Sequence, residues 1–150
     1  MPAFEIASQL AAPRQHVWAH ASTMAGVNAE LRPLIRMTYP RATDRLDPAS
    51  VPLGRPLFRS WVLLLGILPI DRHDLTLVSI DPPTGFYEDS RSWLQRRWVH
   101  IRTLEETPHG CRVTDRLDFT PRLPAMGRLL SIAIRRIFEH RHGYLRRRFG

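Results

Sequence analysis

The sequence predicts a single α+β domain over residues 1–150, in which a curved antiparallel sheet of about six or seven strands wraps on a long C-terminal helix. Three observations lead to this prediction. Strand-like alternation dominates the middle of the chain, short turns separate its apolar runs, and apolar residues recur at helical spacing near the two ends. With 150 residues, 43% of them hydrophobic, the chain is long enough to bury one core.

The N-terminal third predicts one strand, two short helices and a second strand, over residues 3–10, 13–23, 27–32 and 35–39. Pro13 suits the first turn of a helix. Gly26 interrupts the helical pattern, and the residue before Pro33 avoids the helical region, so the second helix is predicted to end there. Residues 40–56 are rich in proline and predict a long loop, of the kind that often forms a functional lid.

The second half predicts five strands, over residues 57–68, 75–80, 86–92, 96–105 and 111–120. A turn is expected at Asp71–Asp74 between the first two of them, and Pro108–Gly110 predicts another. Because short turns join the strands, we expect an antiparallel sheet.

A long amphipathic helix is predicted from Pro124 to about residue 147. Leu130, Ile134 and Ile137 lie on its apolar stripe and are expected to pack on the sheet, with Arg135 and Glu139 on the opposite face. One helix cannot fill a wide curved sheet, which favours an apolar cavity between them.

Successive side chains of a strand point to opposite faces of the sheet, so residues of the same parity (two apart in the sequence) share a face. This alternation identifies the candidate polar groups for the cavity. Asp115 shares the parity of Val113 and Leu117, so its carboxylate should face inward, where it needs partners. Glu88 is flanked by inward-facing positions in the same way. The alternative for Asp115 is an edge position or a carboxylate bound to backbone amides.

His100 shares the parity of Trp98, although the apolar residues on the other parity of this strand leave its direction open. It is predicted to be a ligand contact, a satisfied core histidine or a solvent-facing one. In an enzyme, His100 would act as acid and base with Asp115 orienting it. These two residues are the catalytic candidates.

His140 and Arg141 lie within the apolar stripe of the C-terminal helix. A permanent charge there either snorkels to solvent or needs a buried partner. We therefore predict that Arg141 pairs with Asp115 or Glu88. His140 and His142 diverge on the helix and are not expected to form a site together.

Several stretches extend this interpretation to a known superfamily; they are Leu10–Trp18, Arg59–Pro69, Trp98–His100, Val113–Leu117 and Phe138–His142. With the order of elements, they resemble a bacterial branch of the START-related helix-grip superfamily (SRPBCC), which contains polyketide cyclases, lipid-transfer domains and pollen-allergen-like proteins. The resemblance covers nearly the whole chain. It implies the helix-grip fold and a cavity for a hydrophobic or amphipathic, lipid- or polyketide-like molecule, with a cyclase- or dehydratase-like enzyme as the alternative.

The ligand-binding residues predicted in this way are Glu88, Trp98, His100, Asp115, Phe119, Ile137, His140 and Arg141. No cofactor is expected, because the sequence has no glycine-rich phosphate loop, nucleophile elbow or paired cysteines. No metal is expected either, because His16 and His20 have metal-binding spacing but lack a third ligand.

The net charge of +8 comes from 22 arginines and no lysine, against 14 acidic residues. Such a charge favours nucleic acids or anionic surfaces. The arginines, however, are spread along the chain rather than interleaved with stacking aromatics. We therefore expect no specific nucleic-acid binding.

Cys111 is the only cysteine, so no internal disulfide is expected and a reducing cytoplasm is the predicted location. The sequence does not begin with the pattern of a signal peptide. The uncharged run Ser60–Ile70 is short of the roughly 20 residues of a spanning helix, so no transmembrane segment is predicted. Both faces of this run are apolar, which favours a homodimer, a membrane contact or an interaction module that also uses the arginine-rich C-terminus.

Overall fold

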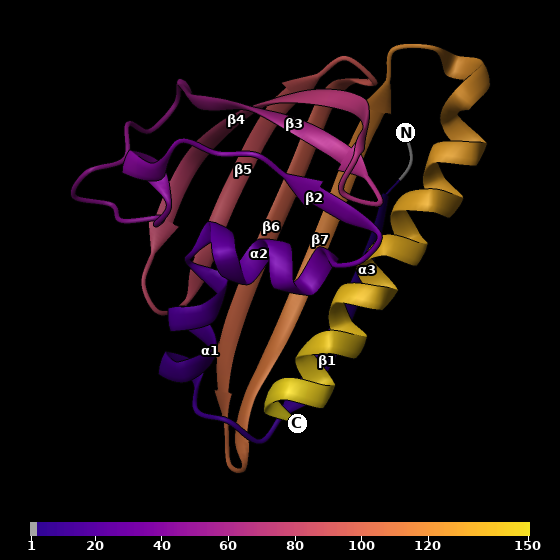
Figure 1. The fold of residues 1–150 in the computed structure, drawn as a ribbon. Coiled ribbons are helices and arrows are strands. Elements are labelled where there is room, and N and C mark those ends of the chain that lie inside the picture. The colour runs from indigo at the N-terminus through magenta and orange to yellow at the C-terminus, as the bar shows by residue number, and fades with distance from the viewer. Residues whose placement is uncertain (1–2) are drawn as a thin grey trace.

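The computed structural model describes residues 3–150 and has the predicted order of elements (Figure 1). The elements are β1 (Ala3–Leu10), α1 (Arg14–Ala21), α2 (Met24–Leu31), β2 (Ile35–Met37), η1 (Arg41–Thr43), β3 (Pro56–Leu64), β4 (Leu68–Asp81), β5 (Gly85–Ser92), β6 (Gln95–Thr107), β7 (Gly110–Pro121), η2 (Pro124–Met126) and α3 (Gly127–Phe149).

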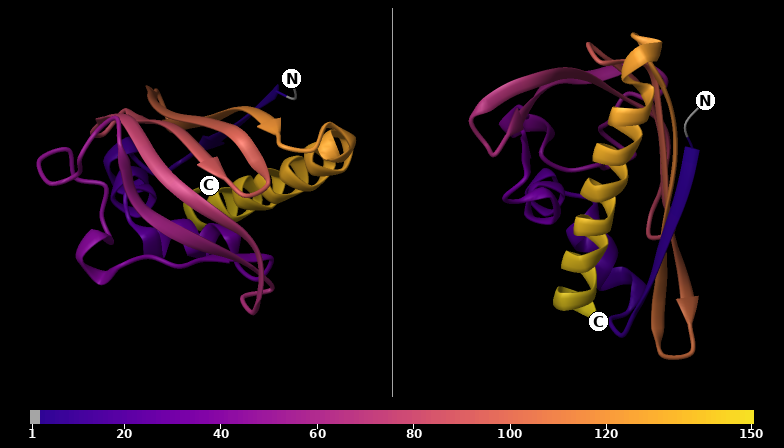
Figure 2. Two further views of the ribbon diagram at one scale, coloured as in Figure 1. Left: turned by 90° about the horizontal axis from the view of Figure 1, so that it is seen from above. Right: turned by 90° about the vertical axis from the view of Figure 1, so that its right-hand side faces the viewer.

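The seven strands form one sheet in the order β1-β7-β6-β5-β4-β3-β2, and its neighbouring strands are antiparallel. Figure 2 shows that the sheet curls so that β3 and β4 arch over the side on which the three α-helices lie. Helix α3 runs along this concave side, close to β1 and β7 (Figures 1 and 2). The helix-grip fold predicted from the sequence is therefore confirmed.

Alternation along β7 builds one side of the core. Cys111, Val113 and Leu117 are fully buried, with Asp115 between them on the same face. The intervening Arg112 and Arg116 are exposed. The predicted parity of this strand is correct, and it places a carboxylate inside the sheet.

Helix α3 packs its predicted face on the sheet. Ile134 is buried, while Leu130 and Ile137 are half-buried beside the same cluster, in which Leu117 of β7 takes part. Arg135 and the neighbouring Glu139 are exposed, as the spacing predicted.

The predicted turn at Asp71–Asp74 is wrong. These residues lie inside β4, and the chain reverses instead at Leu65–Ile67. Gly66, with φ 79°, supplies the left-handed backbone that this turn needs. The polar residues of β4 were misread as a turn because their side chains enter a buried polar cluster.

Gly26 does not end a helix, contrary to the sequence prediction. It lies inside α2, which begins earlier than expected because Thr23 caps it by accepting a hydrogen bond from the Gly26 N–H at 3.0 Å. A Cβ at this position would come 1.9 Å from the carbonyl oxygen of His20. The glycine therefore lets α2 cross close to the end of α1.

Within residues 3–150, no helix is both long and apolar enough to span a bilayer.

Candidate functional site

A cavity of about 220 Å³ lies between the curled sheet, α2 and α3. Most of its wall is apolar and comes from α2, β2 to β6 and α3, including Val27, Val62, Leu77, Phe86 and Ile134. A single water molecule needs only about 10–15 Å³ of such space. The cavity is therefore large enough for an organic molecule and is not a packing defect.

A histidine–carboxylate cluster forms a polar wall of the cavity. Glu88 on β5 accepts a hydrogen bond from His73 Nε2 on β4 at 2.5 Å and another from the Ser90 hydroxyl at 2.6 Å. The Nδ1 atom of His100 on β6 lies 3.8 Å from the other carboxylate oxygen of Glu88. Antiparallel register places these groups together, because Glu88 and His100 are paired across β5 and β6.

Asp115 lies behind this wall and accepts four hydrogen bonds. Its Oδ1 receives His100 Nε2 at 2.7 Å and Arg102 Nε at 2.8 Å, and its Oδ2 receives Arg102 Nη2 at 2.8 Å and His142 Nε2 at 2.7 Å. Its side chain is fully buried. Four donors saturate a carboxylate, so Asp115 holds His100 in place and has no free lone pair for a ligand.

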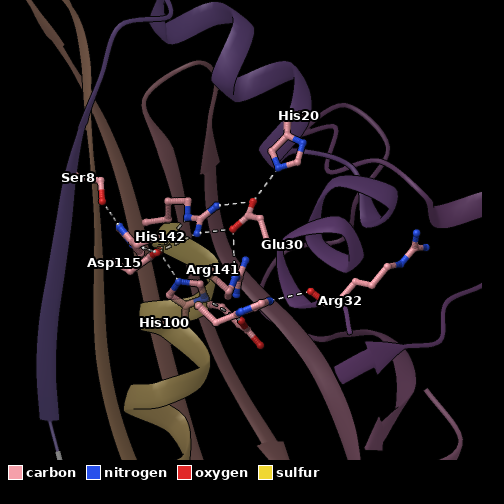
Figure 3. Close-up of polar contacts among 11 residues, drawn as sticks. Ser8, His20, Glu30, Arg32, His100, Asp115, Arg141 and His142 are labelled. Atoms are coloured by element: carbon pink, nitrogen blue, oxygen red, sulfur yellow. Dashed lines mark hydrogen bonds and ion pairs between the residues drawn. The ribbon is translucent and has the colours of Figure 1, made fainter. Parts of the chain in front are cut away.

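His142 extends the cluster to β1. Because its Nε2 donates to Asp115, its Nδ1 accepts from the Ser8 hydroxyl at 2.8 Å. The Ser8 oxygen in turn accepts from Arg146 Nη1 at 3.0 Å. This chain of hydrogen bonds fixes the orientation of the His142 ring between Ser8 and Asp115 (Figure 3).

Glu30 of α2 is the second saturated carboxylate, and it joins three elements (Figure 3). Arg102 donates to both of its oxygens, at 3.0 and 2.8 Å, while Arg141 Nε donates at 3.1 Å and His20 Nε2 at 2.9 Å. One guanidinium, that of Arg102, thus lies between Glu30 and Asp115.

Neighbouring cationic side chains keep the buried carboxylates of the cluster ionised. Burial by itself would raise the pKa of Glu30, but Arg102 and Arg141 hold it well below its ordinary 4.5. The pKa of Asp115 is likewise lowered against the effect of burial, by Arg102 and His100. Both carboxylates are therefore ionised and balanced by two guanidinium groups.

Glu88 and His73 form a second balanced pair. Burial would raise the pKa of Glu88, yet His73 and His100 lower it well below 4.5. Burial would lower the pKa of His73, yet Glu88 raises it above its ordinary 6.5. The polar wall is therefore close to neutral overall.

Of the eight residues predicted from the sequence as ligand contacts, five line the cavity: Glu88, Trp98, His100, Ile137 and Arg141. Asp115, Phe119 and His140 are not among the residues that line the cavity. Asp115 is behind His100, and Phe119 is buried in the core cluster under Trp98. His140 turns toward the end of α2, where its Nε2 donates to the Arg32 carbonyl at 2.6 Å.

The predicted pairing of Arg141 with Asp115 or Glu88 is also wrong. Arg141 is buried and does need a carboxylate, but that carboxylate is Glu30. Helix α2 packs beside α3, so the Glu30 carboxylate reaches Arg141, while Asp115 accepts hydrogen bonds from Arg102. His142, which was not among the predicted site residues, is the residue of α3 that binds Asp115.

Four residues of the cluster were missed: Glu30, His73, Arg102 and His142. The sequence could have indicated two of them from alternation along a strand. Arg102 lies two residues from His100, and His73 lies two residues from Leu75, so each shares a face of its strand with that residue. For Glu30 and His142, only the crossing of α2 and α3 over the sheet brings the side chains to the cluster.

No three His, Cys, Asp or Glu side chains in the described part of the chain are arranged to hold a metal ion.

The end of the β3–β4 hairpin exposes Leu65, Ile67 and Leu68, by 63%, 82% and 56%. The homodimer and the interaction module predicted for this region stay predictions.

Together, the curled sheet and the long covering helix define the helix-grip fold, which the chain shares with solved structures. A START superfamily protein from Mycobacterium smegmatis matches 98% of this chain and 96% of its own, with a TM-score of 0.67 at 11% identity. Ara h 8.0201 matches 95% and 96% with a TM-score of 0.58 at 16% identity. CalU16 from Micromonospora echinospora matches 95% and 75% with a TM-score of 0.57 at 13% identity.

The chain belongs to the family described as Domain of unknown function (DUF8410), whose model matches residues 8–149. No curated protein matches it in sequence. At these identities the solved structures show a shared fold and do not transfer an activity.

Replacing Arg102 with Met is expected to lower the free energy of unfolding by about 3–5 kcal/mol, because it leaves two buried carboxylates without their shared cation. Urea denaturation measures this loss. The matched control is Arg97→Met on the same strand, where the exposed arginine pairs with Asp89 at 3.1 Å. A loss no larger than that of the control would contradict the role given to Arg102.

Stability should fall at both ends of the pH scale. The lowered pKa values of Glu30, Glu88 and Asp115 give stability that is present above their ordinary values, 4.5 for Glu and 3.8 for Asp, and is lost as the pH falls further. The raised pKa of His73 gives stability that is present below pH 6.5 and is lost as the pH rises through the folded value.

Chemical denaturation across pH 3 to 9 tests both effects. The loss on the alkaline side should disappear in the variant His73→Phe, while the acid loss remains. An alkaline loss of equal size in this variant would show that another group causes it.

Proposed function

We propose that the protein binds a largely apolar small molecule that carries hydrogen-bonding groups, in the cavity between its sheet and α3. The observation that carries this proposal is the cavity of about 220 Å³ with apolar walls and one hydrogen-bonding wall. A lipid- or polyketide-like compound fits this description. The balanced charges of the wall favour a neutral ligand over a strongly charged one.

Three side chains of the wall are suited to contact the polar end of such a ligand. Glu88 and His100 reach the cavity from the sheet. Arg141 reaches it from α3, and its side-chain hydrogen bond to Glu30 uses Nε, which leaves the two Nη groups for a ligand acceptor. Trp98 and Ile137 supply apolar contact beside them.

Filling the cavity should abolish binding. We expect the variant Val62→Trp to weaken binding of the neutral apolar dye N-phenyl-1-naphthylamine by about tenfold or more, equal to about 1.4 kcal/mol. Val62 lines the cavity, whereas Val78 of β4 is 45% exposed and does not, so Val78→Trp is the matched control. Dye fluorescence measures the dissociation constants, and circular dichroism checks the fold of each variant.

Native mass spectrometry of freshly purified protein complements this test. A non-covalent adduct that is lost on denaturation would reveal the class of ligand. Dye binding that is not saturable, or that is equal in the Val62 and Val78 variants, would contradict the proposal.

An acid–base enzyme of the cyclase or dehydratase type is the second candidate, and the position of His100 favours it. Its Nε2 donates to Asp115 at 2.7 Å, so a neutral form of the ring would present the Nδ1 lone pair on the side of Glu88. A lone pair at the cavity wall can accept a proton from a carbon next to a carbonyl group.

Exchange of the α-protons of α-tetralone in D₂O, followed by NMR, tests this chemistry. An enzyme of this type should accelerate the exchange, and His100→Gln should lose about 10²–10⁴-fold of the acceleration. An exchange rate equal to that in buffer would exclude His100 as a base for such ketones.

A further inference from the structure

A further polar group on the cavity wall is the side chain of Gln95. This residue begins β6, lines the cavity and is only 4% exposed. Its Oε1 atom is buried without a hydrogen-bond partner in the described part of the chain. Two other side-chain atoms share this property, Nε of Arg14 and Nε of Arg72, but neither residue lines the cavity.

A β-bulge turns Gln95 inward. Gln95 pairs with Pro121 and Arg97 with Thr120, so Arg96 is the extra residue on β6. Arg96 and Arg97 are both exposed, whereas Gln95 is buried. Without the bulge, alternation from Trp98 and His100 would direct Gln95 to the outer face. The strand is therefore distorted in a way that places a carboxamide in an apolar cavity.

The backbone around Gln95 is already satisfied. Its own N–H donates to the Ser92 hydroxyl at 3.0 Å, and the Leu94 N–H donates to Asp71 at 3.1 Å. The turn between β5 and β6 is thereby fixed, and it does not use the side chain of Gln95. An unpaired buried carboxamide oxygen is costly, so its natural partner is a group inside the cavity.

We propose that Gln95 is a specificity-determining contact that recognises a hydroxyl group on an otherwise apolar ligand. A hydroxyl can donate to the unpaired Oε1, which an ether or a carbonyl oxygen cannot do. This inference rests on the proposed ligand-binding function and deepens it by naming a chemical group of the ligand.

The distance between Gln95 and His100 along β6 indicates the shape of the ligand. Gln95 and His100 are five residues apart on β6, which corresponds to about 15 Å along a strand. Trp98 lines the cavity between them. The ligand recognised at both positions is therefore elongated, with a hydroxyl at the Gln95 end, an apolar middle part against Trp98 and a second hydrogen-bonding group at the end of Glu88 and His100.

A matched pair of probes tests the Gln95 contact: 2-naphthol and its methyl ether, 2-methoxynaphthalene. The two share one aromatic body, and the ether lacks the O–H donor. The full-length protein should bind the naphthol about 3- to 10-fold more tightly, the range that one neutral hydrogen bond gives. Isothermal titration calorimetry measures both affinities.

The variant Gln95→Met should bind the two probes equally, with the affinity for the ether unchanged or increased. Gln15→Met is the control, because Gln15 is exposed on α1 and should leave the preference intact. A preference for naphthol that persists in Gln95→Met would overturn the inference, because the hydroxyl would then bind elsewhere.

Equal binding of the two probes by the unmodified protein would also overturn it, and this result does not depend on how well any variant folds. In that case the proposed function would stand, since both probes would still occupy the cavity. If neither probe bound and N-phenyl-1-naphthylamine did not bind either, the proposed function itself would fail.

Discussion

The guanidinium of Arg102 is the interaction on which the rest of the site depends. It is buried between Asp115 of β7 and Glu30 of α2, and it donates to both oxygens of each carboxylate. Two buried carboxylates without a cation would be too costly to keep ionised. Because Arg102 satisfies both, the sheet can carry a charge on its inner face and α2 can cross that face with another.

This arrangement separates structural ions from groups that reach the cavity. Asp115 is fully occupied and acts only through the residues that it holds, above all His100. Glu30 does the same for Arg141 on α3. The His100 ring and the Arg141 guanidinium therefore line the cavity in orientations that Asp115 and Glu30 fix. Because these side chains are already ordered, less conformational entropy is lost when a ligand binds against them.

The fold by itself accounts for little of this chemistry. Solved structures at 11–16% identity share the curled sheet and the long helix. What makes a cavity of this fold selective is the small set of polar side chains on its wall. In this protein that set includes Glu88, His73, His100 and Arg141, together with Gln95, which a bulge in β6 directs inward.

The sequence by itself determined the fold class, the order of elements and the inward direction of Glu88 and Asp115, because alternation and helical spacing are local properties. The tertiary structure decided which charges meet. Arg141 pairs with Glu30 because α2 packs beside α3 on the concave side of the sheet, and no local pattern encodes that contact. The direction of Gln95 depends on a bulge that one added residue creates, which reverses the parity that the sequence indicates.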